Sequence, residues 1–341
     1  MSSKARGLAD LGNAYDDGAL SNRNLVINGA MNVAQRGVSF TGNGYGLDRW
    51  FFNRYSSGAS RTLSQDTDAP EGFSHSLKYA NGGVAETLYY FIQRIERKNF
   101  ERLSGQTVTG SFYVKASEAI TAARWYLAVN GTGDGHNNEV STGTYDITTS
   151  WQRITFTATL GDFSGYITTD SGFMELSPMI AVAPHPSIPA NASLWFTGVQ
   201  LEVGDTATPF EHRSYGDEIQ RCMRYYWETP NDAAYAIVAR GQLNGSVASA
   251  TVFYPKRMRA IPTVAALGTN AGSWYVQQGN TGISTGTTAF SAAWGGATTA
   301  QSSWMDWTNL SGGVTNAALT VMRNNQSTSS KNGCLSFDAE L

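Results

Sequence analysis

Short segments in which apolar and polar residues alternate are the feature that most limits what this chain can fold into. The clearest runs from Arg153 to Leu160, where four apolar residues alternate with arginine and threonine. A period of two turns one set of side chains toward a core and the other toward solvent, as in a half-buried β-strand. Val108 to Lys115 and Arg124 to Asn130 repeat the pattern. Because no helical pattern separates these segments, we predict an all-β fold, a jelly-roll sandwich.

The composition narrows the classes of partner. Charged residues make up 15% of the 341 residues, aromatic residues 12%, and the net charge is −3. The lysines and arginines are scattered, whereas a nucleic-acid binder needs clustered positive charge, so nucleic acid is not an expected partner. No stretch has the length and hydropathy of a membrane span or a signal peptide, so we expect synthesis in a cytoplasm and no membrane insertion.

The stretch from Leu194 to Glu228 changes period from strand to helix. Trp195, Val199 and Leu201 recur at near-even spacing, which indicates a last strand of the first domain. Ser214 and Asp217 then form a capping-box pattern, and Pro230 ends the helical pattern. The predicted helix carries an apolar stripe for packing against the first domain, for trimer contacts or for both: Ile219, Cys222, Met223 and Tyr226.

After Pro230 a second series of short alternating segments begins, separated by turns rich in glycine, serine and threonine. We therefore expect four parts: an N-terminal arm (1–23), a jelly roll (24–213), a linking helix (214–230) and a second, smaller C-terminal β-sandwich (231–341). The alternative is a crossover inside one large β domain. Within the jelly roll, Asn24 to Gly29 is interpreted as a strand that runs into an Asn-Gly hairpin turn.

Four phrases, in this order, resemble the tail-fibre and receptor-binding proteins of tailed bacteriophages. They are NLVINGAMNVAQRG from Asn24, GYGLDRW from Gly44, VQLEVGDTATPFEHRSYGDEIQRCMRYYWE from Val199, and FYPKRMRAIPTV from Phe253. The first three look like the jelly-roll module that those proteins share with carbohydrate-binding modules. The fourth looks like the start of the distal domain that often follows it. The resemblance ends near Val264, so it carries no receptor specificity.

The resemblance implies a homotrimeric fibre in the virion tail that contacts a host surface polysaccharide through its C-terminal domain. Its N-terminal arm would dock on a phage tail protein, and Leu8, Leu11 and Tyr15 form the thin apolar stripe available for that contact. A disordered tail is the alternative interpretation of the same arm.

Aromatic residues among polar loops are what sugar recognition requires, because pyranose rings stack on aromatic faces and their hydroxyls bind polar side chains. The C-terminal part holds such a set: Trp274, Tyr275, Trp294, Trp304 and Trp307. Each could instead fill the core or a trimer interface, but Trp304 and Trp307 are an odd number apart, so at least one should face away from the core.

No metal-ligand, catalytic-triad or nucleophile-elbow spacing is present, and we expect no enzymatic activity. The acids available to a glycan-cleaving site are interpreted as solvated loop residues: Asp134, Glu139, Asp162, Asp170 and Glu175. No cofactor and no metal site are expected. The resemblance leaves room for the structural calcium that carbohydrate-binding jelly rolls often carry, with Glu202 as a candidate ligand. A purely structural tail component and a polysaccharide depolymerase are the two alternative functions.

Overall fold

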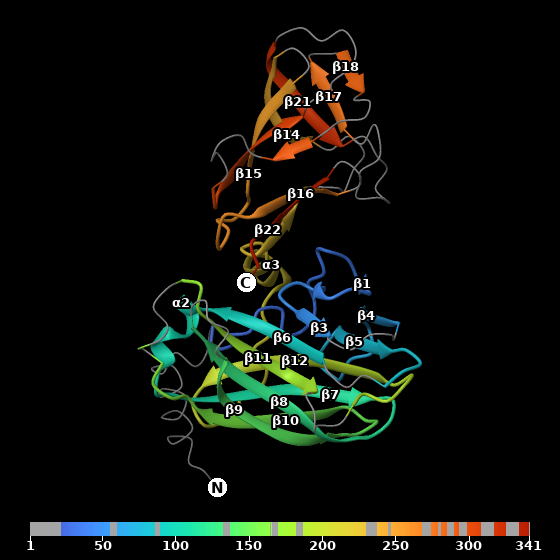
Figure 1. The fold of residues 1–341 in the computed structure, drawn as a ribbon, viewed down its shortest axis with the longest axis vertical. Coiled ribbons are helices and arrows are strands. Elements are labelled where there is room, and N and C mark those ends of the chain that lie inside the picture. The colour runs from blue at the N-terminus through green and yellow to red at the C-terminus, as the bar shows by residue number, and fades with distance from the viewer. Residues whose placement is uncertain are drawn as a thin grey trace, which may run out of the picture. The chain divides into compact units, whose positions relative to one another are not determined.

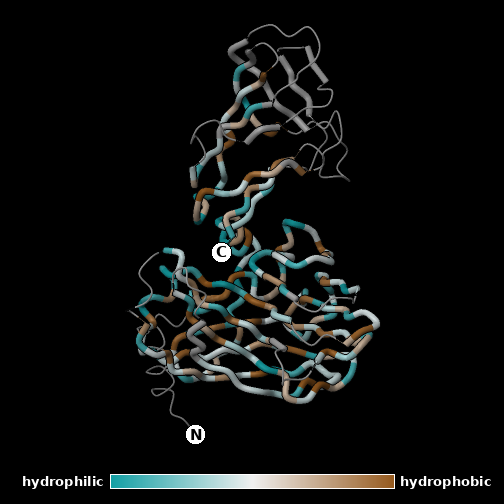
Figure 2. Tube along the Cα trace, in the orientation of Figure 1, coloured by the Kyte–Doolittle hydropathy of each residue, from teal (hydrophilic) through white to brown (hydrophobic). Residues whose placement is uncertain are grey.

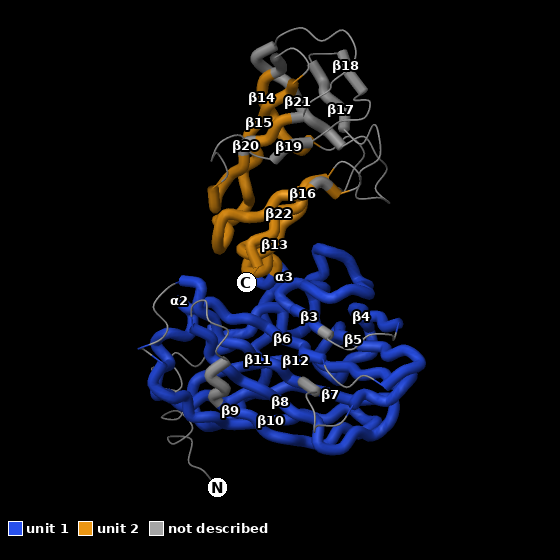
Figure 3. Tube along the Cα trace, viewed as in Figure 1, with its two compact units in different colours: residues 1–218, 341 blue, residues 219–340 orange. Residues whose placement is uncertain are grey.

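The computed structural model divides the chain into two compact units, residues 1–218 with Leu341 and residues 219–340 (Figure 3). It describes residues 22–54, 60–85, 89–131, 137–163, 165, 170–181, 187–229, 237–244, 247–267, 274–278, 281–284, 290–292, 299–307, 317–324 and 334–340. We refer to the two parts as the N-terminal and C-terminal units. The N-terminal arm, with Leu8, Leu11 and Tyr15, lies outside the described residues.

The N-terminal unit is a sandwich of two six-stranded antiparallel sheets (Figure 1). The first sheet has the order β1 (Ser39–Phe40), β4 (Arg61–Asp66), β5 (Ser76–Asn81), β12 (Ser193–Val203), β7 (Thr107–Ala116) and β10 (Gln152–Thr159). The second has the order β2 (Gly44–Tyr45), β3 (Phe51–Arg54), β6 (Tyr89–Glu96), β11 (Phe173–Ala181), β8 (Ile120–Asn130) and β9 (Asn137–Ile147). One turn of helix, α2 (Arg97–Phe100), and a 3₁₀ turn, η1 (Glu101–Leu103), follow β6. The predicted all-β fold is confirmed.

An aromatic cluster joins the two sheets from inside. The ring of Phe91 on β6 lies 4.9 Å from Phe52, 5.4 Å from Tyr79 and 5.1 Å from Phe196, measured between centroids. These partners come from β3, β5 and β12, so one side chain connects both layers of the sandwich. Hydrophobic and hydrophilic residues succeed one another along the strands of this unit (Figure 2), as a period of two requires.

The C-terminal unit contains two further antiparallel sheets. A three-stranded sheet has the order β13 (Tyr226–Glu228), β22 (Cys334–Asp338) and β16 (Thr263–Leu267). A seven-stranded sheet has the order β18 (Thr281–Ser284), β17 (Trp274–Gln278), β21 (Ala317–Asn324), β14 (Ile237–Asn244), β15 (Val247–Phe253), β20 (Ser302–Trp307) and β19 (Phe290–Ala292). The described core of the C-terminal unit includes Phe337 of β22, and the ring of Trp227 stacks on it at a centroid distance of 5.1 Å.

The predicted linking helix is shorter than the sequence pattern indicates. Helix α3 spans Tyr215–Cys222, and Ser214 caps it through the Asp217 N–H at 3.1 Å. Tyr226 is not on this helix, because its backbone pairs with Asp338 of β22. Cys222 is fully buried, while Ile219 and Met223 are half-buried. Strand pairing with the C-terminal end of the chain therefore overrides the helical periodicity beyond Cys222.

The segment Asn24 to Gly29 is not a strand, which corrects the hairpin interpretation. Asn28 has a positive φ of 57°, and its buried side chain donates to the carbonyl oxygens of Val33 at 2.9 Å and Asp48 at 3.0 Å. A Cβ at Gly29 would lie 2.1 Å from the Val199 carbonyl oxygen, so only glycine permits this close approach to β12. The Asn-Gly pair thus docks a loop on the sheet.

The phrases that carry the family resemblance are bound to one another. Arg213 donates to the Val26 carbonyl at 2.9 Å and to Glu211 at 3.1 Å, and Glu211 accepts the Asn24 N–H at 2.9 Å. The Trp50 indole donates to the Asn28 carbonyl at 3.0 Å. The Arg213–Val26 and Glu211–Asn24 contacts each join residues 187 positions apart, so the phrases encode a structural clasp.

No helix in the described part of the chain is long and apolar enough to cross a membrane.

We predict that Phe91→Ala lowers the free energy of unfolding of the N-terminal unit by about 3–5 kcal/mol, because the truncation leaves a cavity among the rings of Phe52, Tyr79 and Phe196. Chemical denaturation of the full chain, followed by tryptophan fluorescence, measures the change. Val84→Ala is the matched control, since Val84 is 53% exposed, and it should cost less than about 0.5 kcal/mol. Equal losses for the two variants would contradict the central role of Phe91.

A second prediction concerns pH. Burial raises the pKa of Glu211, but the Asn24 N–H and the Arg213 guanidinium outweigh burial, so the pKa lies below its ordinary value of 4.5. A depressed carboxyl pKa stabilises the fold above pH 4.5, and that contribution is lost as the pH falls through the folded-state pKa. Glu211→Gln should therefore flatten the acid limb of the stability curve and cost about 1–2 kcal/mol at pH 7.

Denaturation curves of this variant between pH 3 and pH 7 give the measurement. Asp170→Asn is the control, because the Asp170 side chain is 72% exposed. An acid limb that is unchanged in Glu211→Gln would show that the clasp does not contribute to acid sensitivity.

Candidate functional site

The aromatic residues predicted to bind glycan occupy several strands of the C-terminal unit. Trp304 lies opposite Thr251 in the β15–β20 pair, and Trp307 lies opposite Ala248. Trp274 and Tyr275 lie opposite Asn324 and Arg323 in the β17–β21 pair. The side chains of these four residues, and Trp294 as a whole, lie outside the described residues, so a glycan site in this unit stays a prediction.

Glu202, the candidate calcium ligand, is surrounded by donors. It accepts hydrogen bonds from the Thr208 N–H at 2.9 Å and from Gln200 at 2.9 Å, and the Arg23 guanidinium lies 3.7 Å away. These neighbours donate to the carboxylate or repel a cation, so the site does not fit a calcium ion. In the described part of the chain no three His, Cys, Asp or Glu side chains are grouped closely enough to hold a metal ion.

Two of the acids interpreted as loop residues lie on strands instead. Glu139 is in β9, and Glu175 is in β11, where it is only 6% exposed. The alternation in β11 was hidden by Pro178, at a register shift between Leu176 and Met179. Asp162 and Asp170 lie at the surface. Asp162 accepts a hydrogen bond from the Ser104 hydroxyl at 2.9 Å, and Asp170 forms an ion pair with Lys98 at 3.4 Å. Asp134 lies outside the described residues.

The position of Glu175 reveals a polar and aromatic surface that the sequence did not single out. We call it the Arg94 face: the outer surface of β3, β6, β11 and β8. It is formed by Phe51, Tyr90, Ile92, Arg94, Glu96, Phe173, Glu175, Ser177, Arg124, Tyr126, Ala128 and Asn130. Strand register places Arg94 opposite Glu175 and Ser177 opposite Tyr126. The side chains that precede and follow these residues point into the core.

The floor of the Arg94 face is buried although it lies on the outside of a sheet. Tyr126 is 7% exposed, Glu175 6%, Ser177 0% and Asn130 6%. Tyr126 and Ala128 form a small cluster with Tyr90 that is separate from the main core. Outward residues of a sandwich sheet are ordinarily solvated. The buried polar residues of this floor therefore differ from the usual solvated outer surface of a sandwich, which makes the face a candidate site.

The rim of the face is built around Arg94. Its guanidinium donates to Glu175 at 3.0 Å and lies 5.0 Å from the Phe51 ring centroid and 4.8 Å from that of Phe173. The two rings and the carboxylate fix the plane of the guanidinium group. Arg94 keeps 23% of its side chain exposed, which makes it reachable from solvent.

Asn130 adds an unsatisfied donor to the floor. Its side-chain amide nitrogen is buried, and no described group accepts a hydrogen bond from it. A buried amide without a partner costs about 1–3 kcal/mol, and a hydrogen bond from an ordered water or a bound ligand removes that cost. Register places Asn130 opposite Phe173, beside the Arg94–Glu175 pair.

These features match what a polar, hydroxyl-rich ligand requires. Rings take up the C–H face of a sugar, the guanidinium and amide donate to its hydroxyls, and the carboxylate accepts from them. The sequence of Tyr89 to Glu96 contains a sign of this second surface. Tyr90, Ile92 and Arg94 alternate with the inward-facing residues, so they lie on the opposite side of the strand. Large side chains in both phases indicate that both sides of the strand make contacts beyond solvent.

The outer face of the opposite sheet also carries tryptophans, but their partners are internal. The Trp195 indole donates to Asp66 at 3.4 Å, and the Trp151 indole donates to Asp68 at 3.1 Å. Lys115 lies over both rings, at 4.9 and 5.3 Å, and its hydrogen bond lowers the pKa of Asp68. This surface is a closed ion-pair network and is a weaker candidate.

No family model and no curated protein matches the chain. The solved structures to which it is similar include the following three. A CBM4 module is 17% identical, with 52% of this chain and 98% of the module covered and a TM-score of 0.32. The enzymatically active domain of bacteriophage CBA120 tailspike protein 4 is 14% identical, with 53% and 22% covered and a TM-score of 0.33. The CBM22-1 xylan-binding domain of Paenibacillus barcinonensis Xyn10C is 15% identical, with 50% and 94% covered and a TM-score of 0.30.

This chain spans about a fifth of the tailspike domain. All three TM-scores are below 0.5.

Proposed function

We propose that this protein binds a cell-surface glycan on the Arg94 face. The observation that carries the proposal is the buried amide of Asn130, unpaired among the described residues, beside an arginine held between two rings. The described side chains of the face bring two guanidinium groups, Arg94 and Arg124, together with the carboxylates Glu96 and Glu175. This balance suits a neutral sugar more than a polyanion.

The biological setting is proposed from the sequence phrases. The chain acts as a tail-fibre component of a bacteriophage virion, assembled as a homotrimer and docked on a tail protein through residues 1–23. Three copies of one weak sugar site on a single particle gain avidity when they engage the same surface. Residues of α3 and the turn after it, including Ile219 and Met223, are available for trimer contacts.

Binding without cleavage is the activity proposed for the face. A retaining or inverting glycosidase needs one carboxyl group that donates a proton and a second carboxylate across the scissile bond. Glu175 accepts from Arg94 at 3.0 Å, so this carboxyl group is engaged by a cation and suited to holding a hydroxyl.

Asn130→Ala tests the proposal most cleanly, because the amide has no described partner to lose. We expect the affinity for a glycan found on a saccharide array to fall about tenfold, since a hydrogen bond to the sugar is worth about 1–1.5 kcal/mol. Thermal stability should be unchanged or slightly higher. Isothermal titration with a monovalent oligosaccharide measures the affinity without avidity.

Lys98→Ala is the control on the same unit, because the Lys98 side chain is 66% exposed, and it should bind as the wild type does. A double variant, Trp304→Ala with Trp307→Ala, tests the C-terminal site predicted from the sequence. If that variant loses binding while Asn130→Ala keeps it, the Arg94 face is not the glycan site.

A further inference from the structure

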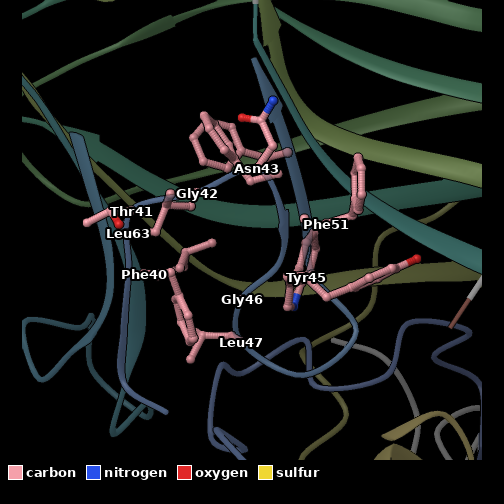
Figure 4. Close-up of a pocket in the computed structure, with 14 residues that line it drawn as sticks. Phe40, Thr41, Gly42, Asn43, Tyr45, Gly46, Leu47, Phe51 and Leu63 are labelled. Atoms are coloured by element: carbon pink, nitrogen blue, oxygen red, sulfur yellow. The ribbon is translucent and has the colours of Figure 1, made fainter. Parts of the chain in front are cut away.

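A cavity of about 290 Å³ lies at one edge of the N-terminal sandwich (Figure 4). It is located where the edge strands β1 and β2 of the two sheets are joined by the turn at Thr41 to Asn43. Core side chains of both sheets form its inner wall, among them Trp50, Phe52 and Leu77. An apolar cavity of roughly 150 Å³ is enough to bind benzene, so this one has room for a larger group.

The chain around the mouth leaves the cavity open. Gly42 and Gly44 lie at the mouth, and a Cβ at either would meet no atom within 4 Å. Gly44 has a φ of +120°, which disfavours any residue with a side chain. At Gly46 a Cβ would lie 2.8 Å from the Phe40 ring, so glycine lets that ring close one side. Unfilled apolar volume destabilises a fold, so a cavity of this size needs a compensating role.

One wall of the cavity is also the rim of the Arg94 face. The rings of Tyr45 and Phe51 meet edge to face at 5.2 Å on one side of the cavity (Figure 4). The same Phe51 ring lies 5.0 Å from the Arg94 guanidinium. The Phe51 side chain therefore both lines the cavity and contacts the Arg94 guanidinium at the rim of the face.

The mouth supplies a small number of polar groups beside the apolar interior. The Asn43 amide donates to Asn53 at 2.9 Å and accepts from Arg61, whose guanidinium lies 4.5 Å from the Phe52 ring. An apolar interior with a polar, fixed mouth is the usual form of a small-ligand site.

We propose that this cavity binds an apolar substituent, of the size of a short acyl group or a ring, carried by the glycan on the Arg94 face. The proposal rests on the proposed function, because Phe51 links the two sites. It assigns to the ligand a mixed chemistry: hydroxyls over Arg94 and Asn130, and an ester-linked or similar apolar group in the cavity.

Phenol is the probe for the cavity alone, and the full chain is titrated with it by ligand-observed NMR. We expect saturable binding that falls at least tenfold in Gly42→Trp, because the indole would occupy the mouth. Thr41→Trp, from the neighbouring exposed position, should act in the same way if Gly42→Trp is poorly folded. Gly161→Trp is the control, since a Cβ there also meets nothing within 4 Å, and it should bind phenol as the wild type does.

The link to the glycan is tested with a polysaccharide that the wild type binds, before and after mild alkaline removal of its ester groups. De-esterification should lower the affinity of the wild type at least tenfold and leave that of Gly42→Trp unchanged. Asn130→Ala should lose glycan affinity and keep phenol binding, so the two sites fail separately. If the wild type does not bind phenol, or if Gly42→Trp binds it equally well, the cavity is not a binding site. If de-esterification leaves the glycan affinity unchanged, or if the protein binds no glycan, the cavity does not hold a substituent of the glycan.

Discussion

The period of two along β6 is the constraint on which the site depends. Phe91 must point inward to meet Phe52, Tyr79 and Phe196, because those contacts connect the two sheets. Once Phe91 is inward, Tyr90 and Arg94 are necessarily outward. The core therefore sets the orientation of the Arg94 face, and a one-residue slip of β6 would bury the arginine and expose the ring.

The same strand also ties the N-terminal segment to the sandwich. Gln93 is inward-facing, accepts the Ile27 N–H at 2.7 Å and donates to the Ile27 carbonyl at 2.7 Å. Arg213 and Glu211 hold the neighbouring residues Asn24 and Val26. The phrases that resemble phage tail fibres thus describe how the module closes, whereas the glycan contacts proposed here come from residues outside those phrases. This separation explains how one fold can be kept while its ligand changes.

The sequence was sufficient for the fold class, because strict alternation in Val108 to Lys115 and Arg153 to Leu160 has one physical meaning. It failed where tertiary contacts replace local pattern. Tyr226 follows a helical period but pairs as a strand with Asp338, and the Asn28–Gly29 pair docks on β12 instead of turning a hairpin. Glu175 was interpreted as a loop residue but lies on β11, whose pairing with β6 shifts register between Leu176 and Met179. The site was missed for the same reason, since Arg94, Glu175 and Asn130 meet only through strand order, which no local pattern specifies.

Hydrogen–deuterium exchange with and without a bound oligosaccharide tests the central claim most directly, because it reports on both units in one experiment. If the glycan binds on the Arg94 face, amide exchange should slow in peptides that cover Tyr89–Glu96, Ile120–Asn130 and Phe173–Ala181. The exchange rate across Ser302–Trp307 should not change. Protection confined to Ser302–Trp307 and Trp274–Gln278 would contradict the account and place recognition in the C-terminal unit.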